Sequence, residues 1–215
     1  MVLEVKDIVY HYKANRDKNV LNHISYQFKE GSVYAILGAS GSGKTTFLSL
    51  LAGLDIPVSG TILYEGEDIQ KKGLNFHRKK NISLVFQNYN LIDYLTPREN
   101  VMLGGTLEPE RLLDAVGIQI EDWDRKVLQL SGGQQQRVAI ARALASTAKV
   151  LLADEPTGNL DEDIAEGITE ILQKSAHEMK KCVIVVTHSR AVAEAADVVI
   201  KIQRGELVEL NGTGR

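Results

Sequence analysis

Four short runs of apolar residues recur along the chain without the alternation that marks a half-exposed strand. They cover residues 33–37, 82–86, 150–153 and 182–186. Such runs are typical of parallel strands that are covered on both faces, and ligands bind beyond the carboxyl ends of those strands in open sheets. The residues that follow the four runs are Gly38, Gln87, Asp154, Thr187 and His188. The pattern therefore predicts a ligand site among these residues.

Helical patterns separate the apolar runs. The apolar residues of 164–179 recur at helical spacing after the acidic start 161–163, which suits the positive end of a helix. Residues 46–52 and 138–145 also favour helices. Strands that alternate with helices indicate an α/β fold with a parallel sheet.

Two hairpins are predicted beside this core. Residues 61–64 run into the turn Glu65-Gly66, and residues 198–203 run into Arg204-Gly205. Together with the alternating N-terminus, residues 1–7, they indicate an antiparallel β lobe.

Residues 89–130 differ from the rest, because prolines and glycines divide them into short helical pieces. These breaks fall at Pro97, Gly104, Gly105, Pro109 and Gly117. We therefore expect one domain over residues 1–215, with core and lobe in 1–88 and 131–215 and a small helical insert at about 89–130.

Composition narrows the class of protein. The chain has 215 residues, 44% hydrophobic and 25% charged, which are ordinary globular values. Its 25 basic and 28 acidic residues argue against a dedicated nucleic-acid partner, and the basic run 78–80 is expected to be a solvated turn. The single Cys182 predicts a buried, inert thiol rather than a disulfide. No apolar window approaches the length of a membrane span or a signal peptide, so we expect an intracellular protein.

The segment after the first run matches the phosphate-loop pattern G-x-x-x-x-G-K-[ST]. Its residues are Gly38, Ala39, Ser40, Gly41, Ser42, Gly43, Lys44 and Thr45. Backbone amides of such a loop wrap a phosphate, Lys44 reaches the β- and γ-phosphates, and the Thr45 hydroxyl binds Mg²⁺. The alternative is a chance glycine-serine turn. A dinucleotide fingerprint does not fit, because Thr46 stands where a third glycine is required.

Two carboxylates close the third run. Asp154 is placed to hold Mg²⁺, and Glu155 can accept a proton from an attacking water. The alternative is that both carboxylates are solvated turn residues. Because they follow a phosphate loop in the chain, a role in phosphoryl chemistry is favoured.

The run 129–137 contains Ser131 followed three residues later by Gln134, the form of a helix capping box. A well-capped helix would explain that pair alone. The whole run, QLSGGQQQR, resembles the signature motif of ATP-binding-cassette (ABC) ATPases. The resemblance covers essentially the full chain, because each motif of the family occurs in the expected order. It implies a P-loop NTPase core with an antiparallel lobe and a helical insert.

The resemblance also implies a set of site residues. Tyr12 would stack on adenine, with Tyr10 as the alternative, and Gln87 would link Mg²⁺ to the membrane partner. His188 would contact the γ-phosphate, and residues 158–161 would cross to a second subunit. The expected catalytic residues are Lys44, Gln87, Glu155 and His188. The expected Mg²⁺ ligands are Thr45, Gln87 and Asp154. The expected ATP contacts are Tyr12, residues 38–46 including Thr46, Gln87, Ser131, Gly132, Gly133, Gln134 and Asp161.

The implied protein is an ATPase subunit that forms a head-to-tail homodimer and powers a separate permease at the inner face of the membrane. The sequence of residues 154–161 resembles that of a bacterial group whose members serve lipoprotein release, macrolide efflux or antimicrobial-peptide resistance. Export of peptides, lipids or drugs is therefore expected. The alternative is a mechanical signalling module with the same ATPase. Residues 87–131 are short for the family, so a trimmed insert is expected, and Tyr89, Leu91, Ile92 and Tyr94 would form its core or line the permease groove.

Overall fold

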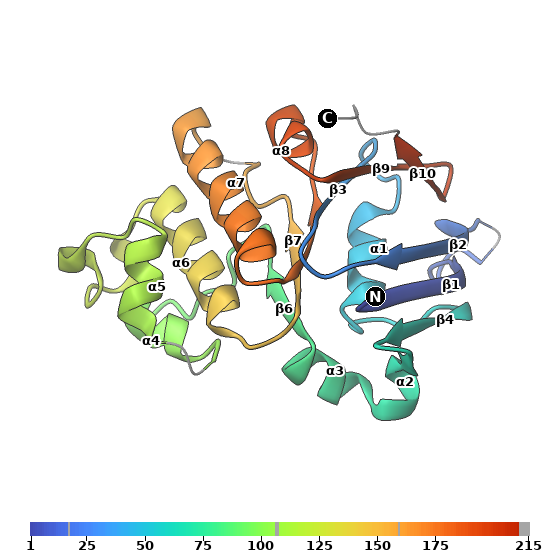
Figure 1. Ribbon diagram of the computed structural model, residues 1–215, viewed down its shortest axis with the longest axis horizontal. Helices are drawn as coiled ribbons and strands as arrows, with labels where there is room; N and C mark the ends of the chain where they lie inside the picture. The colour runs from blue at the N-terminus through green and yellow to red at the C-terminus, as the bar shows by residue number, and fades with distance from the viewer. Residues whose placement is uncertain (17, 106–107, 159, 211–215) are drawn as a thin grey trace.

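The structure is a computed structural model that describes residues 1–210 apart from 17, 106–107 and 159 (Figure 1). Its main sheet has six strands in the order β10-β9-β3-β8-β7-β6. These strands are β3 (Val33–Leu37), β6 (Ile82–Val85), β7 (Val150–Asp154), β8 (Cys182–Val186), β9 (Val198–Gln203) and β10 (Glu206–Leu210). All neighbouring pairs are parallel except β9 and β10. The predicted parallel core is confirmed, and the carboxyl ends of β3, β8 and β7 lie side by side.

A second, antiparallel sheet forms the β lobe beside this core. Its strands, in the order β2-β1-β4-β5, are β1 (Leu3–Tyr10), β2 (Leu21–Phe28), β4 (Ser59–Tyr64) and β5 (Glu67–Asp68). The turn between β4 and β5 is Glu65-Gly66, with φ of 49° and 83°. Two positive φ angles are what the tight turn of a twisted hairpin requires.

The second predicted hairpin forms, but its assignment to the lobe is wrong. β9 pairs with β3 in the parallel sheet, and β10 extends that sheet as an antiparallel edge. Ile200 and Ile202 are fully buried between the two sheets, so the apolar run of β9 behaves as a core strand.

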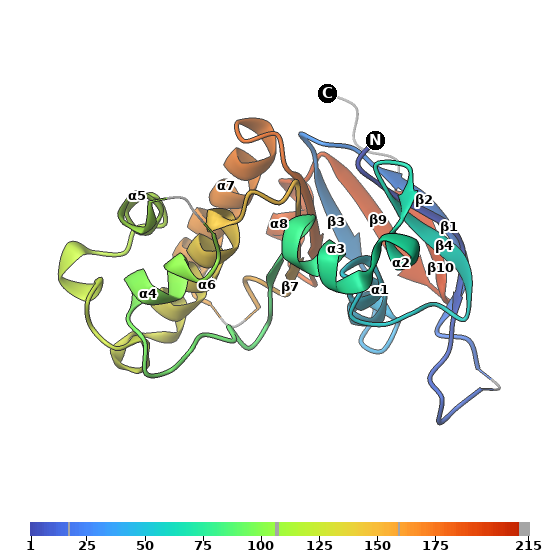
Figure 2. The same cartoon turned by 90° about the horizontal axis from the view of Figure 1, so that it is seen from below.

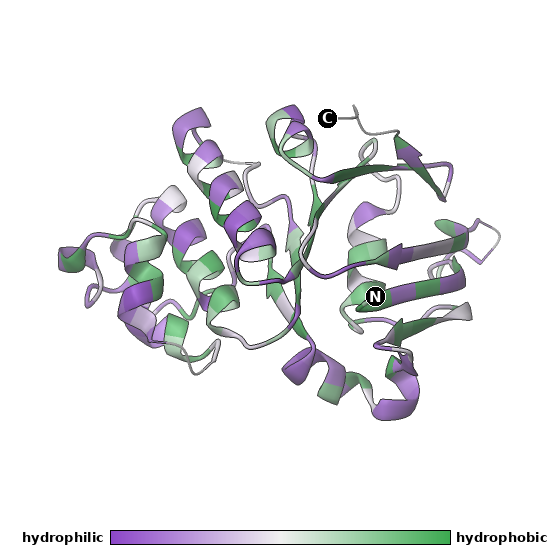
Figure 3. Ribbon diagram, in the orientation of Figure 1, coloured by the Kyte–Doolittle hydropathy of each residue, from purple (hydrophilic) through white to green (hydrophobic). Residues whose placement is uncertain are grey.

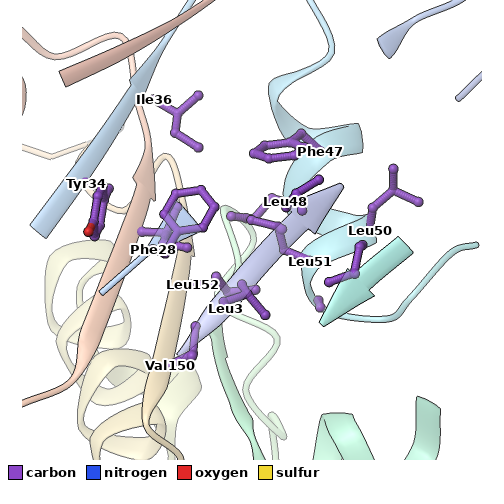
Figure 4. Close-up of a cluster of buried hydrophobic side chains, with 14 of the residues drawn as sticks. Leu3, Phe28, Tyr34, Ile36, Phe47, Leu48, Leu50, Leu51, Val150 and Leu152 are labelled. Carbon is purple, nitrogen blue, oxygen red and sulfur yellow. The ribbon is translucent and has the colours of Figure 1, made fainter. Parts of the chain in front are cut away.

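Helix α1 (Lys44–Leu51) lies between the two sheets and fills the first of two hydrophobic cores. Its Phe47, Leu48, Leu50 and Leu51 pack among side chains of both sheets, such as Phe28 of β2 (Figure 4). The helix starts two residues before the predicted residue 46, because Gly43 already takes the N-cap position. This packing fixes the start of α1 at the carboxyl end of β3.

The uninterrupted strands bury both faces in different cores. In β7, Val150 and Leu152 face the core around α1, whereas Leu151 and Ala153 face a second core on the other side of the sheet. Because successive side chains of a strand point to opposite faces, an apolar run without alternation is what two covered faces require.

The second core joins the sheet to the helical end of the molecule. Its helices are α4 (Pro97–Met102), α5 (Pro109–Ala115), α6 (Gly132–Ala145) and α7 (Glu162–His177), with 3₁₀ turns at Ile120–Asp122 and Val127–Gln129. α6 packs against both α4 and α5. Figure 2 shows these three helices at the end of the molecule opposite the β lobe.

The remaining helices are short: α2 (Ile69–Lys72), α3 (Leu74–Lys80) and α8 (Arg190–Glu194). The basic run 78–80, expected in a turn, is the last turn of α3. Met179 lies beyond the end of α7 and is exposed, although the pattern placed it on the helix. The side of α7 that faces the viewer in Figure 3 is largely hydrophilic. Within the residues that the structure describes, none of the helices combines the length and the apolar character that a membrane crossing requires.

Candidate functional site

The loop between β3 and α1 has the backbone conformation that a phosphate cradle requires. Gly43 has a φ of 101°, which disfavours any side chain, and it caps α1 without a side-chain bond. A Cβ at Gly38 would lie 2.5 Å from the Ser42 Oγ and 2.9 Å from the Ile202 carbonyl oxygen. The glycines therefore leave the amides at the start of α1 accessible to an anion.

Lys44 lies under this loop and is 6% exposed. Its Nζ donates to the carbonyl oxygens of Gly38 and Ala39, at 2.8 and 3.1 Å, and lies 3.2 Å from the His188 Nε2. Burial lowers the pKa of Lys44, while the carboxylates of Glu155 and Asp154 oppose that shift. The ammonium group thus stands between the loop and two acidic side chains.

Thr45 and Asp154 form a pair of hard oxygen donors. The Thr45 Oγ1 donates to the Asp154 Oδ1 at 3.3 Å, and Asp154 is the last residue of β7. Burial raises the pKa of the Asp154 carboxyl, and the Thr45 hydrogen bond opposes the rise. Hydroxyl and carboxylate oxygens suit Mg²⁺, which is usually bound by one or two carboxylates together with substrate phosphates. In the described part of the chain no group of three or more His, Cys, Asp or Glu side chains could hold a metal ion.

Glu155 and His188 meet at the ends of β7 and β8. The Glu155 Oε2 accepts from the His188 backbone N–H at 3.1 Å, and its Oε1 lies 3.3 Å from the His188 Nε2. Glu155 has a φ of 47°, a strained value for a residue with a side chain, and its N–H donates to the Val186 carbonyl at 2.8 Å. The His188 Nε2 can accept from Lys44 only when it carries no proton, and it can donate to Glu155 only when it does. The ring therefore has two exclusive bonding states.

The two tyrosines near the start of α1, Tyr10 and Tyr12, differ in how far their rings are exposed. Tyr12 is 51% exposed, and its hydroxyl lies 2.6 Å from the Thr46 Oγ1 in the first turn of α1. Tyr10 is 6% exposed, bonds to Asp55 through its hydroxyl, and meets Tyr12 edge to face. Only the ring of Tyr12 is open to a ligand in this pair, so the alternative Tyr10 does not fit.

The expected signature segment lies away from the phosphate loop. Ser131 caps α6: its Oγ accepts from the Gln134 N–H at 3.2 Å, and the Gln134 Oε1 accepts from the Ser131 N–H at 2.9 Å. A Cβ at Gly133 would lie 2.9 Å from the Ile164 Cδ1, so this glycine lets α6 approach α7 closely. Figures 1 and 2 both place α6 beside α4 and α5, at the end away from the lobe that covers α1.

The remaining predicted residues lie on the surface. Gln87 is exposed in the turn that follows β6. Asp161 is the exposed N-cap of α7 and makes no side-chain cap bond. Of the segment 158–161, residue 159 lies outside the described residues.

Two polar residues that the sequence reasoning missed support this end of the molecule. Asp122 is 8% exposed; its Oδ2 accepts from the Gln134 Nε2 at 2.8 Å, and its Oδ1 pairs with Arg125 at 2.7 Å. Asn100 is fully buried; its side chain bonds both the N–H and the carbonyl of Ile92, and also the carbonyl of Thr96. Neither residue belongs to a motif or a periodic pattern, so no sequence signal indicated them.

The parallel core, the phosphate loop and the acidic strand end define a nucleotide-binding domain of the P-loop class. Comparison with known proteins identifies the family, because the protein-family model described as "ABC transporter" matches residues 21–158 of this sequence. The chain is 44% identical over 214 residues to YclH of Bacillus subtilis (strain 168), an uncharacterised ABC transporter ATP-binding protein, covering 95% of this chain and 94% of that one. The chain therefore belongs to the ABC transporter family, as an ATP-binding, ATPase member.

Two further likenesses bear on assembly. A dimeric, post-hydrolysis structure of the ATP-binding cassette MJ0796 bound to ADP and Pi superposes with a TM-score of 0.87 at 35% identity, covering 98% of this chain and 99% of that one. The macrolide export ATP-binding/permease protein MacB of Brucella melitensis is 43% identical over 202 residues. That match covers 88% of this chain but 31% of MacB, so the chain corresponds to about a third of that protein.

Proposed function

We propose that the chain binds Mg-ATP between its own phosphate loop and the signature segment of a second copy, hydrolyses it, and thereby drives a separate membrane permease that exports peptides, lipids or drugs. The observation that carries the ATPase chemistry is the cluster of Lys44, His188 and Glu155 at the ends of three adjacent strands. It unites a buried cation, a positioned imidazole and a carboxylate beside a backbone anion cradle.

Each residue of the cluster has a distinct part in hydrolysis. The loop amides and Lys44 hold the β- and γ-phosphates. The Glu155 carboxylate accepts a proton from the water whose oxygen bonds to the γ-phosphorus, while the bond from that phosphorus to the bridging oxygen breaks and ADP leaves. His188 bonds Glu155 through its backbone N–H and turns its ring toward Lys44, so it holds the base and contacts the γ-phosphate.

The metal and adenine ends of the nucleotide have their own residues. Thr45 and Asp154, with Gln87, would hold Mg²⁺, which neutralises charge on the phosphate oxygens when it is bound. The exposed ring of Tyr12, beside the start of α1, supplies a stacking face for adenine.

A second copy completes the site in this proposal. Ser131 and the glycines that follow it lie at the helical end, whereas the phosphate loop lies against the β lobe, so one chain cannot close both around one nucleotide. Head-to-tail pairing through a two-fold axis gives two equivalent sites from one interface. The dimeric state named for the MJ0796 cassette supports this arrangement.

The permease contact is proposed at a groove of about 470 Å³ between the core and the helical end. Its lining includes Phe86, Leu103, Arg78, Lys79 and Arg142. Among the described residues none of these three cations has a carboxylate within 4.0 Å, so the groove favours an apolar segment with acidic residues. Such a partner would hold the chain at the inner face of the membrane, as the fused permease part named in MacB suggests.

The residues expected to form the insert's core or to line the permease groove lie in different surroundings. Of residues 89–94, Asn90 lines it. Leu91 packs against the second core, which is the alternative that the sequence left open. Tyr94 is 73% exposed and does not line the groove.

Light scattering of the purified chain with and without Mg-ATP tests the shared site. ATP should shift the chain from monomer to dimer, and Ser131→Arg should prevent the shift because a bulky cation fills the space of the partner's γ-phosphate. The matched control is Ser146→Arg at the other end of α6. A Ser131→Arg chain that dimerises as well as the wild type would refute the head-to-tail model. Co-purification with its permease, followed by uptake of labelled compounds into inverted vesicles, separates export from mechanical signalling.

A further inference from the structure

The turn after Gln87 has an unfavourable backbone conformation. Tyr89 and Asn90 have φ of 48° and 49°, two consecutive residues with side chains in the left-handed region. Asparagine tolerates this region, but a tyrosine rarely adopts it. The surrounding structure must therefore hold the turn in place.

Arg142, in the last turn of α6, provides that support. Its Nη2 donates to the Tyr89 carbonyl at 3.0 Å and its Nη1 to the Asn90 carbonyl at 2.6 Å. A guanidinium fork suits two adjacent acceptors in a way that a single ammonium group cannot. Burial lowers the pKa of Arg142, and no carboxylate of the described residues lies within ion-pair distance of it. Both of its terminal nitrogens thus donate to these two carbonyls.

The Tyr89 side chain reaches the opposite end of the same helix. A Cβ at Gly132, the first residue of α6, would lie 3.2 Å from the Tyr89 hydroxyl oxygen. Arg142 lies ten positions further along α6, which is about 15 Å at the rise of an α-helix. The turn after Gln87 is therefore bonded to α6 through its backbone at Arg142, and the Tyr89 side chain lies beside Gly132 at the other end of the helix.

We propose that Arg142 is a positioning residue that fixes the turn after Gln87 to the signature helix, so that Gln87 and the Ser131–Gly133 segment move as one body. The consequence for turnover rests on the proposed function, because it needs Gln87 at the Mg²⁺ and Ser131 at the partner's nucleotide. The attachment itself does not. A change at the γ-phosphate that moves Gln87 would be passed to the signature segment without any contact between the two.

Amide hydrogen exchange of the full chain without nucleotide tests the attachment. In Arg142→Gln, amides within residues 88–92 should exchange about 10- to 100-fold faster, since two charge-assisted hydrogen bonds are lost. Protection in the first two turns of α6 should persist. Arg142→Lys should give an intermediate rise. The matched control is Arg137→Gln, because Arg137 lies on the same helix and donates to the carbonyls of Val116 and Gly117; it should leave residues 88–92 unchanged. Unaltered exchange at 88–92 in Arg142→Gln would overturn the proposal.

Steady-state kinetics test the coupling. Arg142→Gln should lower kcat for ATP by about tenfold with KM changed less than twofold, and Arg142→Lys should recover part of kcat. Faster exchange with an unchanged kcat would reduce the contact to a structural one and reject the coupling. If the wild type itself does not hydrolyse ATP, the proposed function fails, while the exchange result still decides whether Arg142 holds the turn.

Discussion

Replacing Glu155 by glutamine removes a proton acceptor while changing the shape of the site very little. The glutamine Oε1 can still accept from the His188 backbone N–H, where the Glu155 Oε2 now accepts at 3.1 Å. Its amide nitrogen then faces the His188 Nε2, which lies 3.3 Å from the Glu155 Oε1. The positive φ of 47° is no more costly for glutamine than for glutamate. The change therefore isolates the loss of the base.

Loss of a general base typically lowers the rate about 10²- to 10⁴-fold, which corresponds to about 3 to 5 kcal/mol of activation free energy. Single-turnover hydrolysis at saturating Mg-ATP measures the chemical step, and a nucleotide titration measures affinity. The single-turnover rate should be lower than that of the wild type by a factor in that range, while the ATP affinity should stay within a few-fold of wild type. Glu162→Gln, at the exposed first residue of α7, is the control and should hydrolyse normally.

Two results would refute the reasoning. A Glu155→Gln rate within threefold of wild type would mean that Glu155 is not the base. A parallel loss of ATP affinity would mean that its carboxylate shapes the pocket rather than the chemistry. If Glu155 is the base, ATP persists in the variant and the dimer should accumulate on light scattering, and adding Ser131→Arg should abolish that dimer.

Three further changes probe other parts of the molecule. Lys44→Ala should greatly weaken Mg-ATP binding in a titration, because a buried cation under the phosphates is lost, and wild-type affinity in the folded variant would contradict the site. Tyr12→Ala should cost about 1 kcal/mol of nucleotide binding by loss of stacking while Tyr12→Phe is nearly silent, and equal losses would instead indicate a role for the hydroxyl at Thr46. Burial lowers the pKa of Lys181 from 10.5 to about 8, so the unfolded chain binds more protons between those values and stability rises with pH there. Urea unfolding should accordingly show wild type gaining about 2 to 3 kcal/mol relative to Lys181→Met between pH 7 and pH 10, and a constant difference between the two would contradict the shift.

Much of the site could be predicted from the sequence because parallel strands end at one edge. Lys44, Asp154, Glu155 and His188 each follow an apolar run, so the pattern alone placed them on the same side of the sheet. Their contacts with one another could not be predicted without the order of the strands in the sheet. β8 lies between β3 and β7 although it comes after both in the chain, and that order brings His188 within reach of both Lys44 and Glu155.

What the sequence did not reveal has a common physical cause. Arg142 bonds backbone carbonyls, and Asn100 bonds a backbone N–H and backbone carbonyls, and the backbone offers such groups at every position whatever the residue. No spacing or composition therefore marks these bonds in advance. The place of β9 was mistaken for a similar reason, because a hairpin pattern fixes the local turn but not the neighbour on its other side.

Because the side chains of each core strand pack in two different hydrophobic cores, the position of a substitution along the strand decides which core it disturbs. Whether a position in β7 is odd or even decides which core its side chain joins: Leu152 packs with α1, and Leu151 packs in the core that contains α6 and α7. Successive residues of the strand thus pack in different cores, while residues two positions apart pack in the same core. A substitution at Leu151 or Ala153 therefore changes the packing of the second core directly, whereas a substitution at Val150 or Leu152 changes the packing around α1.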